Sequence, residues 1–103
     1  TGVQTCALPI FIALPGGYGT LDELFEMLTW AQLGLHRKPI GLLNTAGFYD
    51  PLLSMIDHMR AQGFLQGINQ VCILVDREAS ALLNKMIQFI AQPVAGPMGP
   101  EHI

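Results

Sequence analysis

A glycine-rich turn near the start of the chain restricts the accessible folds more than any other feature of the 103 residues. Residues 15–20 read Pro-Gly-Gly-Tyr-Gly-Thr, between a wholly apolar run at 11–14 and a helical pattern over 20–33. A short apolar run that stops at proline and glycine is typical of a strand buried on both faces. Glycines accept positive φ and let the backbone approach an anion, towards which the free amides of a helix start point. The segment predicts a strand, a phosphate-binding loop and a helix of a nucleotide-handling α/β enzyme.

The rest of the chain repeats this alternation. Apolar runs at 39–44 and 71–75 predict two further strands, with residues 45–47 as an exit turn. Two more helices are expected, over about 50–63 and about 77–91. Three strands that alternate with three helices are typical of a doubly wound parallel sheet.

Several residues predict where the helices begin and end. Gly34 and Gly63 stand where left-handed C-terminal caps would fall, and Phe64 is placed to fold back on the preceding turn. Asp50 and Asp76 are the expected N-caps of the second and third helices.

The composition indicates a chain that something else covers. Only 13% of the residues are charged, against roughly 25% in a typical domain. Three strands are also few for a sheet of this kind. We therefore expect the C-terminal part of a larger domain, completed by further residues or by a partner subunit.

Charge and hydropathy exclude some classes of partner. The net charge of −3 argues against a nucleic-acid groove or an anionic membrane surface. No apolar run reaches the roughly 18 residues of a membrane span. Cys6 and Cys72 make neither a metal spacing nor a disulfide framework, so a cytoplasmic location is expected.

Both ends of the chain are expected to lie outside the folded unit. Residues 1–10 resemble the translation of a common short-read sequencing adapter, and a natural N-terminal extension is the alternative. The folded part is then 11–91. Residues 92–103 are rich in proline and glycine, which predicts a disordered tail.

The spacing of the loop glycines excludes two common phosphate motifs. The dinucleotide fingerprint would require glycine where Asp22 stands, and the P-loop would require lysine where Thr20 stands. What remains is an anion cradle at the carboxyl end of a strand, where open α/β sheets bind ligands. The Thr20 hydroxyl is a further candidate ligand group.

Glu23 has two interpretations. Thr20 and Glu23 have capping-box spacing, in which the carboxylate would bond back to the Thr20 amide. Alternatively, Glu23 lies on the same side of the helix as Met27 and Trp30 and faces a developing positive charge in a cleft. Met27 and Trp30 are also candidates for packing against another subunit.

The full motif, Pro-Gly-Gly-x-Gly-Thr-x-x-Glu over residues 15–23, resembles that of the LOG ("lonely guy") family of cytokinin riboside 5′-monophosphate phosphoribohydrolases. The similarity continues through residues 29–34, 38–44 and 47–50 and fades after Gly63. The resemblance implies a Rossmann-like homodimer that cleaves the N-glycosidic bond of a nucleoside 5′-monophosphate. It also implies a catalytic role for Glu23 and a phosphate and ribose site at Gly16, Gly17, Tyr18, Gly19 and Thr20.

The same resemblance implies a second catalytic residue, an arginine in an upstream motif that this chain does not contain. The three arginines here, Arg37, Arg60 and Arg77, are not expected to replace it. We therefore expect this chain alone to be inactive and without a stable fold. A non-catalytic nucleotide or phosphate carrier of the same fold is the alternative function.

Other chemistry finds little support. The proteins of this family were long labelled lysine decarboxylases, yet neither Lys38 nor Lys85 has a context that suggests a pyridoxal phosphate Schiff base. No metal or other cofactor is expected. The three histidines, His36, His58 and His102, share no metal-ligand spacing with one another or with Cys72.

Overall fold

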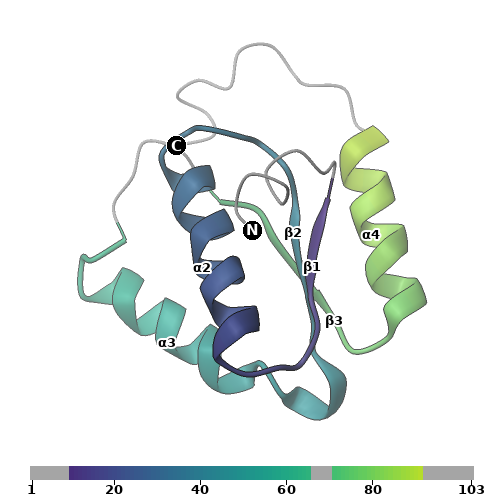
Figure 1. Cartoon of the computed structure of the whole chain (residues 1–103), viewed down its shortest axis with the longest axis horizontal. Coiled ribbons are helices and arrows are strands. Elements are labelled where there is room, and N and C mark those ends of the chain that lie inside the picture. Colours follow the sequence, from purple (N-terminus) through teal and green to yellow (C-terminus); the bar gives the residue numbers. More distant parts are fainter. Residues whose placement is uncertain (1–9, 66–70, 92–103) are drawn as a thin grey trace.

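The computed structural model describes residues 10–65 and 71–91. Strands and helices alternate as the sequence predicts (Figure 1). In chain order the elements are β1 (Phe11–Ala13), α2 (Tyr18–Gln32), β2 (Ile40–Leu43), the short 3-10 helix η1 (Thr45–Gly47), α3 (Asp50–Ala61), β3 (Ile73–Asp76) and α4 (Ala79–Ala91).

The strands form a parallel sheet in the order β1-β2-β3. Ile40 of β2 pairs with Phe11 of β1 and with Ile73 of β3. Helices α2 and α3 lie on one side of the sheet and α4 lies on the other (Figure 1). The predicted α/β class, a parallel sheet wound on both faces, is confirmed. Because the strands are parallel, all three end at one edge, so the segments that follow them begin close together.

The core lies between α2 and the sheet. Leu24, Met27 and Ala31 of α2 are buried at helical spacing. They pack with apolar residues of β1 and β2 and with one aromatic residue before α3, namely Phe11, Ala13, Ile40, Leu42 and Tyr49. On the opposite face, Leu82 and Met86 of α4 are fully buried against β2 and β3.

Glycine at position 41 allows this close approach of α4. A β-carbon at Gly41 would lie 2.6 Å from the sulfur of Met86. Strand β3 is less covered than its neighbours, and all four of its residues are half-buried.

The glycine stops of the first two helices are confirmed. Gly34 and Gly63 have φ of 80° and 86°. After each of them the chain turns back, with hydrogen bonds from Leu35 N–H to Trp30 O and from Phe64 N–H to Met59 O, both 2.9 Å. The fold-back of Phe64 is confined to its backbone, because its ring is 78% exposed.

The two predicted aspartate caps are wrong. Tyr49 is the N-cap of α3, and Asp50 is the first helical residue, with its carboxylate turned to the Asn44 side chain. Asp76 ends β3 and accepts a hydrogen bond from the Glu78 N–H at 3.0 Å. This local turn uses the carboxylate before α4 begins at Ala79.

The expectations for residues 1–9 and 92–103 fall outside the described residues. Of the adapter-like segment only Ile10 is described, and it is half-buried. In the described ranges, no helix has both the length and the apolar character needed to cross a membrane.

Candidate active site

The glycine loop lies where the sequence predicts, between the end of β1 and the start of α2, at the carboxyl edge of the sheet. Helix α2 begins at Tyr18, two residues earlier than expected, with Gly17 as its N-cap. The first backbone bond of the helix runs from Leu21 N–H to Gly17 O, 3.1 Å. The amides of Tyr18, Gly19 and Thr20 therefore have no partner inside the helix.

In the described part of the chain, neither a side-chain cap nor a first-turn carboxylate neutralises this helix start. Gly17 has no side chain with which to cap it, and no acidic residue lies in the first turn. Unpaired amides and the positive end of the helix dipole together favour an anion, by roughly 0.3–1 kcal/mol for the dipole at an exposed site.

The loop glycines have two different physical explanations. A β-carbon at Gly16 would collide with the Thr20 hydroxyl oxygen, so the Thr20 side chain lies directly over Gly16. At Gly17 and Gly19 an added β-carbon would meet no atom within 4 Å. Packing inside this chain therefore explains glycine at position 16 only. At positions 17 and 19, glycine leaves room for close approach to the backbone.

The positive φ that glycine permits is not used in this loop. Among the described residues, the glycines with positive φ are Gly34, Gly47 and Gly63, all at turns elsewhere. The loop does not need the left-handed conformation because the helix begins directly at Tyr18.

The Tyr18 side chain projects from the helix start and is 95% exposed. Its ring therefore makes few contacts with the described part of the chain, and it stands at the rim of the loop.

The capping-box interpretation of Glu23 is excluded. Thr20 is the third residue of α2, not its N-cap, and the cap position carries no side-chain hydrogen bond. Glu23 lies further along α2, one helical turn beyond Gly19 and Thr20, with an exposed side chain. Because the first turn takes no cap from Glu23, its carboxylate is free of that structural role.

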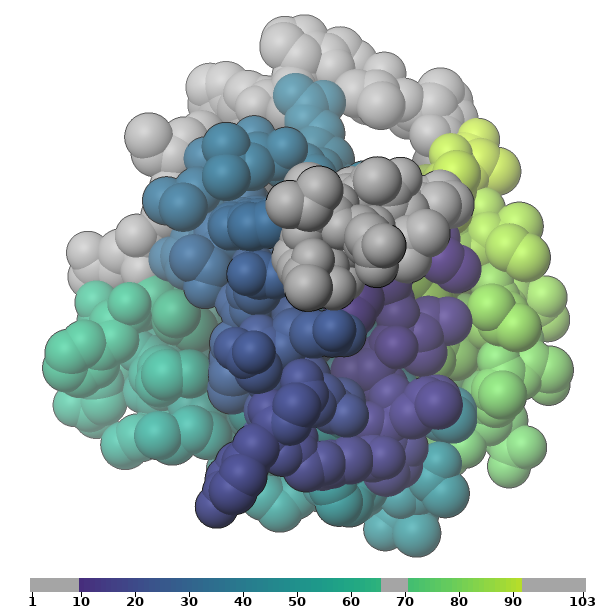
Figure 2. Space-filling model, in the orientation of Figure 1, coloured from purple at the N-terminus to yellow at the C-terminus, as the bar shows by residue number. Residues whose placement is uncertain are grey.

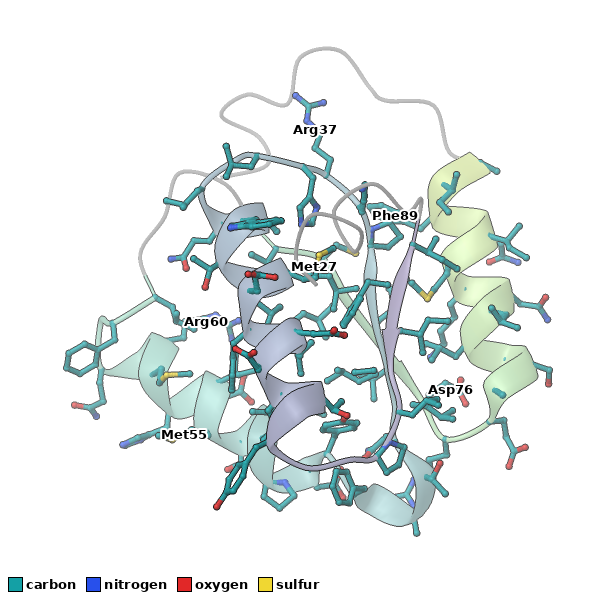
Figure 3. The ribbon with its side chains drawn as sticks, in the orientation of Figure 1. Met27, Arg37, Met55, Arg60, Asp76 and Phe89 are labelled. Atoms are coloured by element: carbon teal, nitrogen blue, oxygen red, sulfur yellow. The ribbon has the colours of Figure 1, made fainter. Side chains whose placement is uncertain are left out.

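The expected grouping of Glu23 with Met27 is wrong. Met27 is fully buried between α2 and the sheet (Figure 3), because it belongs to the core face of the helix. It can therefore neither flank an exposed carboxylate nor contact another subunit. Trp30 is half-buried and remains partly accessible.

A buried polar network beside the loop was not anticipated from the sequence. Asn44, 5% exposed, follows the last residue of β2. Its Oδ1 accepts from the Tyr49 backbone N–H at 2.6 Å, and its Nδ2 donates to Asp50 Oδ1 at 2.9 Å. The Tyr49 hydroxyl donates to the carbonyl of Leu14, at 2.5 Å, across 35 residues of sequence. A polar residue directly after a buried strand was the available signal for Asn44.

Burial shifts one pKa in this network. Desolvation raises the pKa of the Tyr49 phenol above its usual range. Tyr49 therefore keeps its proton at neutral pH and remains a hydrogen-bond donor to the Leu14 carbonyl.

The ion pairs of Arg60 and Arg77 are made with carboxylates other than Glu23. Arg60 pairs with Asp57 at 3.0 Å within α3, and Arg77 lies 3.8 Å from Asp50 after β3. Arg37 follows the C-terminal end of α2, the end opposite to the glycine loop (Figure 3). None of the ion pairs formed among the described residues brings an arginine to Glu23.

Of the two candidate lysines, Lys85 has side-chain partners, while the hydrogen bond of Lys38 is made by its backbone. Lys85 Nζ donates to Val75 O at 2.6 Å and lies 3.1 Å from Asp76. The backbone N–H of Lys38 donates to His36 Nδ1 at 3.0 Å. Within residues 10–65 and 71–91, no group of three histidine, cysteine, aspartate or glutamate side chains is placed to hold a metal ion.

Comparison with known proteins places these features in a family. The model of the family described as "Possible lysine decarboxylase" matches residues 9–86. The chain is 54% identical over 79 residues to the probable cytokinin riboside 5′-monophosphate phosphoribohydrolase LOGL1 of Oryza sativa subsp. japonica. The aligned region covers 77% of this chain and 35% of the relative.

Two further relatives have names of the same kind. Cytokinin riboside 5′-monophosphate phosphoribohydrolase LOG of the same rice is 50% identical over 86 residues, 84% of this chain and 36% of the relative. LOG1 of Arabidopsis thaliana is 50% identical over 80 residues, 78% of this chain and 38% of the relative. The chain thus spans little more than a third of the length of these relatives. Because the family model matches most of its residues and the LOG phosphoribohydrolases are about 50% identical to it, the chain belongs to the "Possible lysine decarboxylase" (LOG) family.

Proposed function

We propose that the complete protein to which this chain belongs hydrolyses the N-glycosidic bond of nucleoside 5′-monophosphates, including cytokinin riboside 5′-monophosphates, to the free base and ribose 5-phosphate. The observation that carries the proposal is the start of α2. There, uncapped amides, the Thr20 hydroxyl and the Glu23 carboxylate lie within two turns of one helix. The names of relatives about 50% identical support the same reaction.

In this proposal the 5′-phosphate lies against the loop. The backbone of Gly16, Gly17 and Gly19 allows its close approach, while the amides of the first turn and the Thr20 hydroxyl donate to its oxygens. The exposed Tyr18 ring closes over the ribose at the rim of the site.

Glu23 then acts at the ribose. Cleavage of the glycosidic bond passes through an oxocarbenium-like transition state, whose positive charge a carboxylate stabilises. The same carboxylate orients or deprotonates the attacking water. Because the phosphate is held one helical turn away, its binding energy places the ribose next to Glu23.

The remaining parts of the assembly lie beyond this chain. We propose that the remaining length of the protein supplies a catalytic arginine. A homodimer forms through the region of α2 that includes Trp30, without the buried Met27. The cytoplasm is the proposed location, where the free thiol of Cys72 stays reduced.

The decisive experiment uses the complete protein with AMP and isopentenyladenine riboside 5′-monophosphate, with released base as the measurement. Substituting Glu23→Gln is expected to lower the rate by at least about 100-fold, as for the loss of an acid–base group. Binding of ribose 5-phosphate, measured by calorimetry, should change little, because the loop is untouched.

Glu26→Gln is the matched control, since it removes a carboxylate from the same helix three residues later. It should leave the rate within about twofold of the unsubstituted protein, because Glu26 has no proposed role. Unchanged release in Glu23→Gln would remove Glu23 from the mechanism. Phosphate binding without any base release would favour the carrier function instead.

A further inference from the structure

We propose that Tyr49 is a positioning residue for the phosphate loop: its buried hydroxyl holds the carbonyl of Leu14 and so sets where the loop amides lie. The inference rests on the proposed phosphate site, and it assigns a role to a residue that lies outside the Pro-Gly-Gly-x-Gly-Thr-x-x-Glu motif. Tyr49 need not touch the substrate in order to act.

The contact lies at the point where the loop leaves the sheet. Strand β1 ends at Ala13, so Leu14 is the last residue before Pro15 and the glycines. The Tyr49 hydroxyl donates to the Leu14 carbonyl at 2.5 Å. Tyr49 is 1% exposed, so its hydroxyl reaches the Leu14 carbonyl from inside the fold, although Leu14 itself is 57% exposed.

Tyr49 is itself held from several directions. Its backbone N–H donates to Asn44 Oδ1 at 2.6 Å, and the Asn44 backbone N–H donates to Asp76 O at 2.8 Å. The ring of Phe48 meets that of Tyr49 edge-on, with centroids 5.0 Å apart. The segments that leave β1, β2 and β3 are thus linked through one tyrosine and one asparagine.

The anchoring matters because the phosphate donors in this site are mostly backbone amides. Glycine-rich backbone loses more conformational freedom on ordering than any other, so a loose loop would weaken binding. Fixing the carbonyl of Leu14 limits the positions open to the next three residues before ligand arrives. The Thr20 side chain lies over Gly16 at the other end of the same loop.

The test is Tyr49→Phe in the complete protein, which keeps the ring and removes only the hydroxyl. We expect KM for the nucleoside 5′-monophosphate to rise about 3- to 12-fold, the effect of one net hydrogen bond, with kcat changed less than about twofold. The affinity for ribose 5-phosphate should fall by a similar factor. Amide exchange of the peptide spanning residues 14–19 should accelerate. A purely structural role would lower the folded fraction and the apparent kcat, without this selective rise in KM.

Ser54→Ala is the control, since it removes an exposed hydroxyl from α3 five residues away. It should leave KM and amide exchange unchanged. Asn44→Asp offers a second route, because it keeps the acceptor for the Tyr49 N–H but loses the donor to Asp50. It should raise KM in the same direction by a smaller factor. The proposal is overturned if Tyr49→Phe leaves both KM and the ribose 5-phosphate affinity unchanged. If Tyr49→Phe does not fold, the same result in Asn44→Asp overturns it.

The binding measurement separates the two proposals. If the complete protein releases no base but binds ribose 5-phosphate less tightly after Tyr49→Phe, the reaction proposal fails and the role of Tyr49 stands. If base release persists with unchanged KM and affinity, the role of Tyr49 fails and the reaction proposal stands.

Discussion

At the scale of single residues, Asn44 shows how much one buried amide can hold. Both ends of its side chain are used, the oxygen by the Tyr49 N–H and the nitrogen by the Asp50 carboxylate. A buried group that loses such a partner costs about 1–3 kcal/mol. The buried position of Asn44, 5% exposed, makes it sensitive to a change of charge.

Asn44→Asp is expected to destabilise the protein at pH 7 by about 1–3 kcal/mol. The substitution replaces the hydrogen bond from the Asn44 amide to the Asp50 carboxylate by two carboxylates that face each other. Like charges favour the protonated form, so the penalty appears as the pH rises above the usual aspartate range, about 3.9. Urea unfolding at pH 3 and pH 7 measures it. In the double variant Asn44→Asp with Asp50→Asn, the donor and acceptor exchange places and most of the stability returns. Equal destabilisation at both pH values would contradict this account.

A substitution at Gly19 should raise the stability of the protein and weaken its binding of ligand. It lies in the first turn of α2, and an added β-carbon would meet no atom within 4 Å. Gly19→Ala should therefore stabilise the protein by about 0.5–1 kcal/mol in thermal unfolding, as alanine does in a helix. The same methyl obstructs the approach to the proposed phosphate site, so ribose 5-phosphate should bind less tightly.

Gly16→Ala is the contrast to Gly19→Ala. Its β-carbon collides with the Thr20 hydroxyl, so both stability and ligand binding should fall. If Gly19→Ala bound ribose 5-phosphate as tightly as the unsubstituted protein, the approach to the backbone would not lie on that side of the loop.

At the scale of elements, the junction between β3 and α4 depends on one carboxylate. The pKa of Asp76 is lowered first by the hydrogen bond from the Glu78 backbone N–H and next by the Lys85 side chain. Lys85 also donates to Val75 O, so it joins α4 to the end of β3 in two places. These contacts hold α4, which covers the second face of the sheet in the part of the chain that the structure describes.

A lowered pKa makes this contribution depend on pH in a defined direction. The ionised form of Asp76 is favoured in the folded state, so its stabilising effect is present above the ordinary pKa of about 3.9. The effect is lost as the pH falls through the lower folded value. Asp76→Asn should therefore lower the melting temperature at pH 7 and have little effect at pH 3.

Asp57→Asn is the control for Asp76→Asn. Asp57 pairs with Arg60 on the surface of α3, where both side chains are more than half exposed. Its loss should move the melting temperature very little at either pH, because exposed pairs are screened by solvent. A similar shift in both variants would show that Asp76 acts only as a surface charge.

At the scale of the whole molecule, α4 has apolar residues on two faces. Leu82 and Met86 are buried against the sheet, while Leu83, Ile87 and Ile90 are 42%, 59% and 51% exposed. Figure 2 shows α4 along one flank of the molecular surface. Together with the low charged share of the chain, the exposed apolar face supports the expectation that this chain is unstable or associates when it is expressed alone.

Ile87→Lys should therefore raise the concentration at which the isolated 103-residue chain stays unaggregated and reduce its binding of a hydrophobic dye. Gln88→Lys is the matched control, because it adds the same charge to the neighbouring exposed position. Light scattering over a concentration series separates the two. Equal gains from both substitutions would mean that net charge, not the apolar face, governs association.

The features that the sequence determined by itself depend on local chemistry. Among the described residues, apolar runs and helical periodicity predicted the three strands and the three α-helices, while η1 was expected only as a turn. Gly34 and Gly63 marked two helix ends because glycine readily takes the left-handed conformation there. The loop position and the family likewise followed from one contiguous motif, residues 15–23, although the roles of Glu23 and the loop residues remain proposals.

Tertiary structure decided what depends on distant partners. Met27 faces the core, and Asp50 turns from its predicted cap to the Asn44 side chain, because the sheet and η1 set what each of them meets. The bond from Tyr49 to Leu14 spans 35 residues and exists only because the parallel strands end at one edge. Local sequence patterns do not predict such pairings, since the contact energy arises only once separate segments have packed together.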